Sequence, residues 1–440
     1  MSNYRRYERY KGSGVEWIGE IPVEWEVKPL KRVFKIVNGG TPSSSEENYW
    51  NGEIVWITPN DLSKLTEVYI KDSERKITED GLYNCSAKKV PMNSIIISTR
   101  APIGYVAIAG VDLCTNQGCK SLIPTKVINH KYFYYWIYSI SFYLNALGQG
   151  TTFMELSNSS LSMVELLTPS MNEQKAIANF LYEKTAEIDA LITDKEKLIE
   201  LLQEKRQAII TEAVTKGLNS SVRMKDSGIE WIGEIPEHWD IRRIKYLSNI
   251  RNVKASDGDN DKTYVGLESI ESKTGKLLTN NNDEQQAVGE TANIFKKGDV
   301  LFGKLRPYLA KCIVADFNGR CTSELLVLRT GSNMLPEYLY LFMLSPIFID
   351  VVNSSTYGAK MPRASWDFIG NLKVPLPNIK EQEEIVEYLI KLKNNMDDLI
   401  FDISTQIQKL KEYRQSLISE AVTGKVDVRE FENMSEVINE

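Results

Sequence analysis

The sequence predicts an α+β protein in which two α+β domains are separated by two long helices, arranged as a tandem duplication. The first observation is that the six-residue segment WIGEIP occurs at 17–22 and again at 231–236. The second is that each copy ends in a long segment without proline or glycine whose apolar residues follow heptad spacing. The third is that short strand-like runs followed by a helical pattern fill the regions between, which is typical of α+β domains.

The two copies are most alike at their ends. KGSGVEWIGEIPVEW matches KDSGIEWIGEIPEHW at a shift of 214 residues. PSMNEQKAI from Pro169 matches PNIKEQEEI from Pro377, and RQAIITEAVTKG matches RQSLISEAVTGK, both at a shift of 208. The middles share only scattered positions. A repeat of about 210 residues is too long for a solenoid, so each copy is a domain followed by a helix.

These landmarks divide the chain into predicted segments that follow one another along the sequence. The predicted segments are a first domain at 1–170, a first helix at 171–217, a second domain at 218–378, a second helix at 379–425, and a C-terminal tail at 426–440.

The heptad pattern predicts that the two helices pair as an antiparallel coiled coil. Core helices of ordinary domains are the alternative, but those average about 11–12 residues, and at about 1.5 Å per residue each of these segments would reach about 60 Å. Antiparallel pairing would place the two domains at opposite ends of a rod, related by an approximate two-fold axis. Gly217 and Gly424 stand where helix-ending glycines belong. The predicted seam residues are Ile177, Leu181, Ile188, Leu191, Leu198, Leu202 and Ile209 in the first helix, and Ile385, Leu389, Leu392, Met396, Leu399, Ile403, Leu410 and Leu417 in the second.

Each predicted domain contains strand-like runs and then a helix. Aromatic stripes in these helices are interpreted as core residues rather than as a ligand platform. The strand-like runs begin at Glu53, Asn93 and Lys120 in the first domain and at Lys262, Gly298 and Ser323 in the second, and the helices begin at His130 and Pro336.

Composition and charge limit the class of protein. The chain has 53 basic and 59 acidic residues, a net charge of −6, which by itself disfavours a nucleic-acid partner. The excess negative charge lies in the two helical regions and the tail, whereas both domains are balanced and leave room for a basic face. The chain has no apolar run of 18 residues, so we predict no membrane span. Because the start lacks an apolar signal and the five cysteines are few, we predict a cytoplasmic location with reduced thiols.

The sequence lacks the motifs of cofactor-dependent catalysis. It has no adjacent prolines, which excludes the Asn/Asp-Pro-Pro-aromatic loop of amino methyltransferases, and no glycine-rich nucleotide or phosphate loop. Asp257, Asp259, Asp261 and Glu268 have calcium-loop spacing, but Lys262 occupies the position that requires glycine. We interpret this run as a solvated acidic turn, and we predict no cofactor, no metal and no catalytic residue.

The motifs together resemble the DNA specificity subunit of type I restriction–modification enzymes. The resemblance covers almost the whole chain and rests on the paired SG(V/I)EWIGEIP segments, the GGTPS…YWNGEIVWIT run from Gly39, the two PxxxEQ helix openings and the two RQxxIxEAVTxG segments. It implies two target-recognition domains that each read one half of a split site in double-stranded DNA. It also implies that the helices set the spacer and dock two methyltransferase subunits, that restriction (translocase) subunits join the complex, and that this subunit has no catalytic site.

Polar residues on loops are the candidates for DNA contact. Lysine, arginine and small hydroxyl side chains suit phosphates, whereas Arg, Lys, Asn and Gln suit base edges. Two loops recur at equivalent places in both domains with different polar residues, as expected if each domain reads a different sequence. The candidates are Thr41, Ser43, Arg100, Asn116, Gln117, Lys120, Gln149, Thr151 and Thr152 in the first domain, and Lys304, Arg306, Lys311, Ser323, Tyr357, Lys360 and Arg363 in the second.

Two other classes of protein remain as alternatives. One is a non-catalytic coiled-coil adaptor whose two domains bind protein or glycan. The other is a self-contained restriction enzyme, against which the missing cofactor loops count. A gel shift with a methyltransferase subunit and random duplex DNA separates all three.

Overall fold

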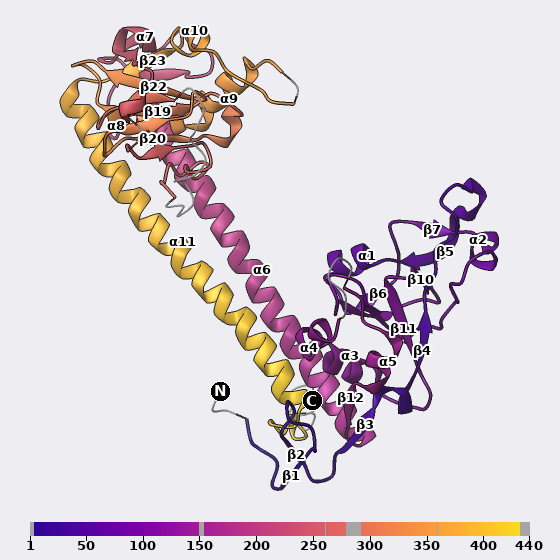
Figure 1. The fold of residues 1–440 in the computed structure, drawn as a ribbon. Coiled ribbons are helices and arrows are strands. Elements are labelled where there is room, and N and C mark those ends of the chain that lie inside the picture. Colours follow the sequence, from indigo (N-terminus) through magenta and orange to yellow (C-terminus); the bar gives the residue numbers. More distant parts are fainter. Residues whose placement is uncertain (1–3, 149–153, 260, 279–291, 359, 432–440) are drawn as a thin grey trace. The chain divides into compact units, whose positions relative to one another are not determined.

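The chain is an α+β protein with an internal duplication, as the sequence predicts. The computed structural model describes residues 4–148, 154–259, 261–278, 292–358 and 360–431. These residues form two compact units (Figure 1). Unit 1 comprises Met1–Asp194 with Gln406–Glu440, and unit 2 comprises Lys195–Thr405. Both long helices therefore contribute to both units, and the linear domain limits stay a prediction.

Unit 1 contains a five-stranded sheet of order β4-β11-β8-β9-β6 and a three-stranded sheet of order β10-β5-β7. Smaller two-stranded pairs, β1-β2 and β12-β3, flank them. The elements are β1 Tyr10–Gly12, β2 Glu20–Pro22, β3 Glu26–Pro29, η1 Leu30–Arg32, β4 Phe34–Asn38, η2 Glu47–Tyr49, β5 Trp50–Ile57, α1 Pro59–Lys64, β6 Tyr69–Ile70, β7 Lys76–Ile77, α2 Glu79–Tyr83, β8 Ile95–Ser98, β9 Val106–Ala109, β10 Cys114–Thr115, β11 Cys119–Pro124, α3 His130–Ser139, α4 Ser141–Ala146, α5 Asn158–Met163 and β12 Glu165–Thr168.

Unit 2 has a related but not identical arrangement of strands: its larger sheet has one strand fewer, and a different strand is central in its smaller sheet. Its four-stranded sheet has the order β16-β22-β19-β20, its three-stranded sheet the order β17-β21-β18, and its pairs are β13-β14 and β15-β23. The elements are β13 Met224–Asp226, β14 Glu234–Pro236, β15 Asp240–Arg243, α7 Ile244–Leu247, β16 Ser248–Ile250, η3 Asp257–Asp259, β17 Tyr264–Val265, β18 Asn293–Phe295, β19 Val300–Gly303, η4 Pro307–Leu309, β20 Cys312–Val314, β21 Gly319–Cys321, β22 Leu325–Thr330, α8 Pro336–Leu344, α9 Pro346–Ser354, α10 Trp366–Ile369 and β23 Lys373–Leu376.

The predicted core helices α3 and α8 begin at the expected residues and bury most of their aromatic side chains. Tyr132 in α3 and Tyr338 in α8 are fully buried. The Tyr132 hydroxyl donates to the carbonyl oxygens of Leu167, at 3.2 Å, and Val422, at 3.3 Å. The carbonyl of Val422 belongs to the far end of the chain, so α3 anchors the last turn of the second long helix in unit 1.

Unit 2 contains the matching arrangement. The Tyr338 hydroxyl donates to the carbonyl of Val214 at 3.1 Å, in the last turn of the first long helix. The two long helices are α6, Met171–Lys216, and α11, Ile379–Val422. Each helix thus starts beside the domain of its own repeat and ends packed into the domain of the other.

Residues that are shared by the two copies connect the start of each long helix to its domain. Trp25 and Trp239, which follow the two WIGEIP segments, are fully buried. The indole N–H of Trp25 donates to Glu173 at 3.1 Å, and that of Trp239 donates to Glu381 at 2.8 Å. Both acceptors are the glutamate of a PxxxEQ motif. A buried indole N–H needs such an acceptor, which explains why this pair occurs twice.

The glutamine of each motif connects the helix start to the neighbouring short helix. Gln174 accepts the backbone N–H of Asn129 at 3.0 Å, and Gln382 accepts that of Leu335 at 2.9 Å. At the other end of each helix, Gly217 and Gly424 have φ of +75° and +72°. This left-handed conformation stops a helix and favours glycine.

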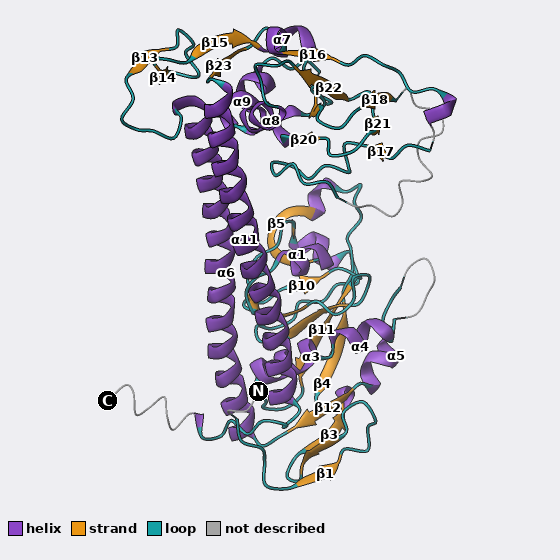
Figure 2. Ribbon diagram, turned by 90° about the vertical axis from the view of Figure 1, so that its left-hand side faces the viewer, coloured by secondary structure: helices purple, strands orange, loops and turns teal. Residues whose placement is uncertain are grey.

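The two long helices lie side by side within each unit (Figure 2) and run antiparallel. Equivalent ion pairs join them in the two units. In unit 1 Arg414 donates to Asp189 at 3.0 Å, and in unit 2 Arg206 donates to Asp397 at 2.6 Å. The 208-residue shift converts one pair into the other, so the duplication extends to the helix packing. The predicted placement of the domains at the ends of a rod stays a prediction.

The residues of the predicted seam differ in burial, and three of them are exposed. Leu191, Leu198 and Leu399 are 49%, 45% and 45% exposed, respectively. The isoleucine after each of them is less exposed, and Ile192 is only 8% exposed. Each of the three exposed leucines thus belongs to a Leu-Ile pair, where either residue satisfies a spacing of three or four. Tertiary packing buries the isoleucine more than the leucine.

Among the described residues, no helix combines the length and the apolar character that crossing a membrane requires.

Candidate nucleic-acid interface

Two loops of unit 2 that the sequence singled out separately lie together. The first follows β19 and carries Lys304 and Arg306; the second precedes α10 and carries Lys360 and Arg363. The Arg306 N–H donates to the Pro362 carbonyl at 2.7 Å, and the Ala364 N–H donates to the Lys304 carbonyl at 2.9 Å. These backbone bonds make the two loops one surface, which we call the unit 2 loop pair (residues 304–310 and 357–364 without 359).

The unit 2 loop pair exposes cationic and aromatic side chains. Arg306 and Lys360 are exposed, Lys304 is half-buried, and Tyr357 is 65% exposed. Within the described part of the chain, no side chain forms a hydrogen bond or ion pair with the charged groups of Lys304, Arg306 or Lys360. Arg306 also has a φ of +51°, a conformation that costs energy for a residue with a side chain and occurs often at functional sites. Free cations beside an aromatic ring suit an anionic, base-containing ligand.

Three other predicted contacts of unit 2 use their side chains internally or lie partly covered. Lys311 donates from Nζ to the Leu267 carbonyl at 2.5 Å, and burial lowers its pKa. Ser323 is half-buried in the turn before β22. Arg363 forms two hydrogen bonds to Glu324, both 3.2 Å long, and this pairing raises the pKa of Arg363. Their contact with DNA stays a prediction.

Unit 1 has an equivalent loop after β8. Its Arg100 donates to Glu155 at 3.1 Å, and the Leu156 N–H donates to the Thr99 carbonyl at 2.8 Å. The second loop of this pair, with the predicted contacts Gln149, Thr151 and Thr152, lies outside the described residues.

The remaining candidates of unit 1 gather near the ends of β4 and β11. Thr41 hydrogen-bonds to Gln117, and the Asn116 side chain accepts the Gly118 N–H at 2.9 Å. Ser43 is exposed and lies within hydrogen-bonding distance of Ser45, at 2.8 Å.

Lys120 differs from the other candidates because its side chain points into the fold. It is only 6% exposed, and burial lowers its pKa. A phosphate contact from this position would require the side chain to rotate outward.

Sequence reasoning missed two residues of this region. Tyr308, in the same loop as Arg306, is 46% exposed, and its aromatic character next to a basic residue was the available signal. No sequence signal pointed to Glu324, because its partner Arg363 lies 39 positions further along the chain.

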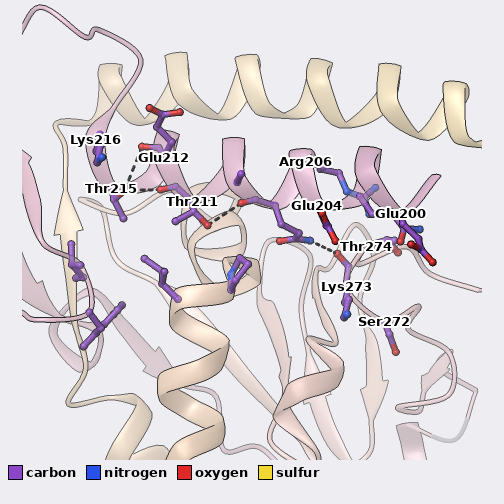
Figure 3. Close-up of a pocket in the computed structure, with 17 residues that line it drawn as sticks. Glu200, Glu204, Arg206, Thr211, Glu212, Thr215, Lys216, Ser272, Lys273 and Thr274 are labelled. Atoms are coloured by element: carbon purple, nitrogen blue, oxygen red, sulfur yellow. Dashed lines mark hydrogen bonds between the residues drawn. The ribbon is translucent and has the colours of Figure 1, made fainter. Parts of the chain in front are cut away.

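Both units also carry a groove where a long helix meets the domain. In unit 2 the groove has a volume of about 900 Å³ and is lined by Gln203, Arg206 and Gln207 of α6 together with domain residues including Trp231 (Figure 3). Gln207 donates to the Lys273 carbonyl at 3.4 Å across this groove, while its side-chain oxygen is buried without a partner in the described structure.

The groove of unit 1 lies at the equivalent place. It has a volume of about 800 Å³ and is lined by Lys411, Arg414 and Gln415 of α11, with Tyr138 from the domain. The three helix residues are the 208-residue counterparts of those in unit 2. Grooves of this size at equivalent positions suit two copies of one partner.

The cysteines and acidic residues give no arrangement typical of a metal centre or a reactive thiol. Burial raises the pKa of Cys114 and Cys321 to about 12, which keeps these thiols protonated and unreactive. Asp259, in the acidic run, is engaged by Ser256 at 2.8 Å and Lys262 at 2.7 Å. The described residues contain no cluster of three metal-ligating side chains.

Fold and loops together define a duplicated α+β recognition protein whose two units share a pair of long helices. Residues 22–201 and 236–409 each match the family model of the type I restriction modification DNA specificity domain. The chain therefore belongs to the family of type I restriction–modification specificity subunits.

Individual relatives agree with this assignment. The chain is 29% identical to the MjaIX specificity subunit of Methanocaldococcus jannaschii, over 94% of this chain and 96% of that protein. It is 21% identical to the EcoDI specificity subunit of Escherichia coli, over 93% and 90% of the two chains.

Solved structures share the fold. A chain from a study of complex assembly and conformational transition of the type I R-M system matches with a TM-score of 0.67 at 16% identity, covering 92% of this chain and 99% of that one. The HsdS subunit of Thermoanaerobacter tengcongensis matches with a TM-score of 0.51 at 16% identity, covering 92% and 98%.

Proposed function

We propose that this chain is a non-catalytic DNA-binding subunit in which each unit reads one half of a split target in double-stranded DNA. One observation carries the proposal: equivalent loops, built on the same duplicated topology, present different polar side chains. Unit 2 offers Ser323 before β22 and Lys304, Arg306 and Lys360 on its loop pair, whereas unit 1 offers Gln117 before β11. Two similar frames with different reading residues suit two different half-sites.

The long helices would set the distance between the half-sites. Each helix starts beside one domain and ends in the other, so helix length would fix the spacing that the chain accepts. The seam and the ion pairs Arg414–Asp189 and Arg206–Asp397 would hold the two helices in register.

Two methyltransferase subunits are the proposed partners of the helices. The equivalent grooves support two copies, and exposed apolar side chains on the helix surfaces support a covering protein. Such side chains include Leu191, Leu198, Leu201, Leu399 and Phe401, of which Phe401 is 71% exposed. Methylation would occur on a base flipped out of the duplex into the partner's active site, and restriction subunits would join this complex.

The experiment combines binding with mapping of methylated sites. The chain purified with its methyltransferase subunit should shift duplex DNA, and sequencing of DNA methylated by the complex should show a two-part motif with a constant gap. Methylation at an undivided motif would overturn the split-site proposal. Failure of the complex to bind any duplex, with binding to a protein or glycan instead, would support the adaptor alternative.

A further inference from the structure

Glu324 joins the two loops of the unit 2 loop pair. It lies in the turn between β21 and β22, where its backbone carbonyl accepts the Lys304 N–H at 3.0 Å. Its carboxylate accepts two hydrogen bonds from the guanidinium of Arg363, both 3.2 Å long. One residue therefore holds the first loop by its backbone and the second loop by its side chain.

Arg363 is fixed by backbone contacts as well. It forms an isolated antiparallel bridge with Leu305, and another with Tyr357 that closes its own loop. Planar, two-bond pairing of arginine with a carboxylate is specific in geometry. Both hydrogen bonds therefore engage Nε and Nη2 of Arg363 within the protein.

Unit 1 has a contact at the same place with the charges reversed. The 208-residue shift that relates the helices also relates Glu155 to Arg363, and both residues form an antiparallel bridge to the loop after the equivalent strand. Glu155 accepts a hydrogen bond from Arg100 at 3.1 Å. The same backbone position thus carries an acid in one unit and a base in the other, and each finds an opposite charge.

The source of the opposite charge differs because the local backbone differs. The backbone carbonyl of Gly118 accepts the Thr99 N–H at 2.8 Å, just as the Glu324 carbonyl accepts that of Lys304. Gly118 has no side chain to offer, and a Cβ there would lie 3.0 Å from Pro59. Unit 1 supplies the partner charge from Arg100, in the loop itself.

We propose that these ion pairs are latches that hold the DNA-reading loops of each unit in one arrangement, and that Arg363 and Arg100 are positioning residues and not DNA contacts. This inference rests on the proposed function. A phosphate contact common to both units would need a cation at this position in both, but unit 1 has Glu155 there. What the two units share is the pairing of opposite charges between the loop and its neighbour.

Exchange of the two charges in unit 2 tests the latch. Arg363→Glu, Glu324→Arg and the double variant are prepared in the full chain with its methyltransferase subunit. Each single variant should weaken binding to the parental target by about tenfold and relax base preference in one half-site only, since a misplaced base contact has a cost of that order. The double variant should recover to within about threefold of the parent if the pair acts as a unit.

The dependence of affinity on salt separates a latch from a DNA contact. A residue that neutralises a phosphate contributes about one unit to the slope of log affinity against log salt. Arg363→Gln, which keeps size and loses charge, should leave that slope unchanged. A double variant as weak as Arg363→Glu alone, a slope reduced by about one in Arg363→Gln, or single variants that bind like the parent would each overturn the latch.

Matched variants in unit 1 serve as the control. Arg100→Glu with Glu155→Arg should affect the other half-site and leave the first unchanged. Thermal unfolding of every variant should stay close to that of the parent, because partly exposed ion pairs contribute little to global stability. If the parental complex itself had no sequence preference, the proposed function would be contradicted. Measurement of the parent alone therefore separates failure of the proposed function from failure of the latch.

Discussion

At the scale of single residues, side chains that occur in both repeats form hydrogen bonds between the long helices and the domains. Glu173 accepts the Trp25 indole at 3.1 Å, and its other carboxylate oxygen accepts the Ser170 hydroxyl at 2.8 Å. One side chain therefore both caps α6 and satisfies a buried donor. Its counterpart Glu381 accepts the Trp239 indole N–H at 2.8 Å and lies 3.0 Å from His238.

Replacement of Glu173 by alanine should destabilise unit 1. The change removes the helix-capping contact and leaves the buried Trp25 N–H without an acceptor, which together should cost about 1–3 kcal/mol. Urea unfolding followed by tryptophan fluorescence measures the loss. Glu183→Ala, an exposed position on the same helix, should change stability by less than about 0.5 kcal/mol, and equal effects of the two variants would contradict this role.

Lys360 is the residue of the unit 2 loop pair most suited to a phosphate contact, because it is exposed and no described side chain neutralises it. Lys360→Ala should weaken DNA binding by the complex for all sequences alike and lower the salt slope by about one. Titrations at several salt concentrations on a matched and a singly altered duplex measure both effects. Lys391→Ala, exposed on α11, is the control, and an unchanged slope for Lys360→Ala would remove this residue from the interface.

At the scale of elements, the choice between adjacent leucine and isoleucine residues decides which face of a helix is buried. Ile192 is 8% exposed and Leu191 is 49% exposed. The buried set follows alternate spacings of four and three, from Ile188 to Ile192 and onward, as a coiled coil requires. The leucines left outside form apolar surface that suits a protein partner.

Ile192→Ala and Leu191→Ala should therefore differ in their effects on stability and on partner binding. The first removes buried methyl groups and should cost about 2 kcal/mol or more of stability, whereas the second should cost less than about 0.5 kcal/mol. Thermal unfolding measures the difference. If the exposed stripe docks the methyltransferase subunit, Leu191→Ala should weaken that association by titration calorimetry, and equal destabilisation by both variants would contradict the observed seam.

The length of α6 should set the gap in the DNA target if the proposed function holds. Seven residues inserted after Glu196 would lengthen the helix by about 10 Å, close to three base-pair steps of about 3.4 Å. Mapping of methylated sites should then show unchanged half-sites with a changed gap, or no methylation because the inserted turns also rotate one unit. Changed half-sites with an unchanged gap would refute the role of the helix as a ruler.

At the scale of the whole molecule, the duplication produces two units that each contain parts of both repeats. The last turn of α6 bonds through Val214 to Tyr338, and the last turn of α11 bonds through Val422 to Tyr132. Each unit is thus completed by the helix end of the other repeat. Chain segments far apart in sequence are therefore required for one core.

The purified chain alone should bind no S-adenosylmethionine. It lacks the sequence motifs that hold this cofactor, and the methyltransferase partner is expected to supply them. Titration calorimetry of the lone chain should give no heat of binding, while the complex with the methyltransferase subunit should bind. Micromolar binding by the lone chain would contradict the assignment of catalysis to the partner.

The sequence alone predicted the duplication, the two long helices, the α+β domains and the family. These features are local or repetitive: a 208-residue shift, a heptad pattern and the absence of proline and glycine can be read without knowledge of contacts. The sequence also placed the candidate DNA-contact loops at equivalent positions of both domains, and it identified Arg306 and Lys360 as basic residues on them.

Only the tertiary structure decided which residues of these patterns act together. Leu191 and Ile192 have similar hydrophobicity, so tertiary packing and not the sequence determines which one is buried. Arg363 lies 39 residues from Glu324, and Arg100 lies 55 residues from Glu155. No local pattern records such distances, because folding brings these charges together, and the resulting pairs support the proposed role of Arg363 as a latch.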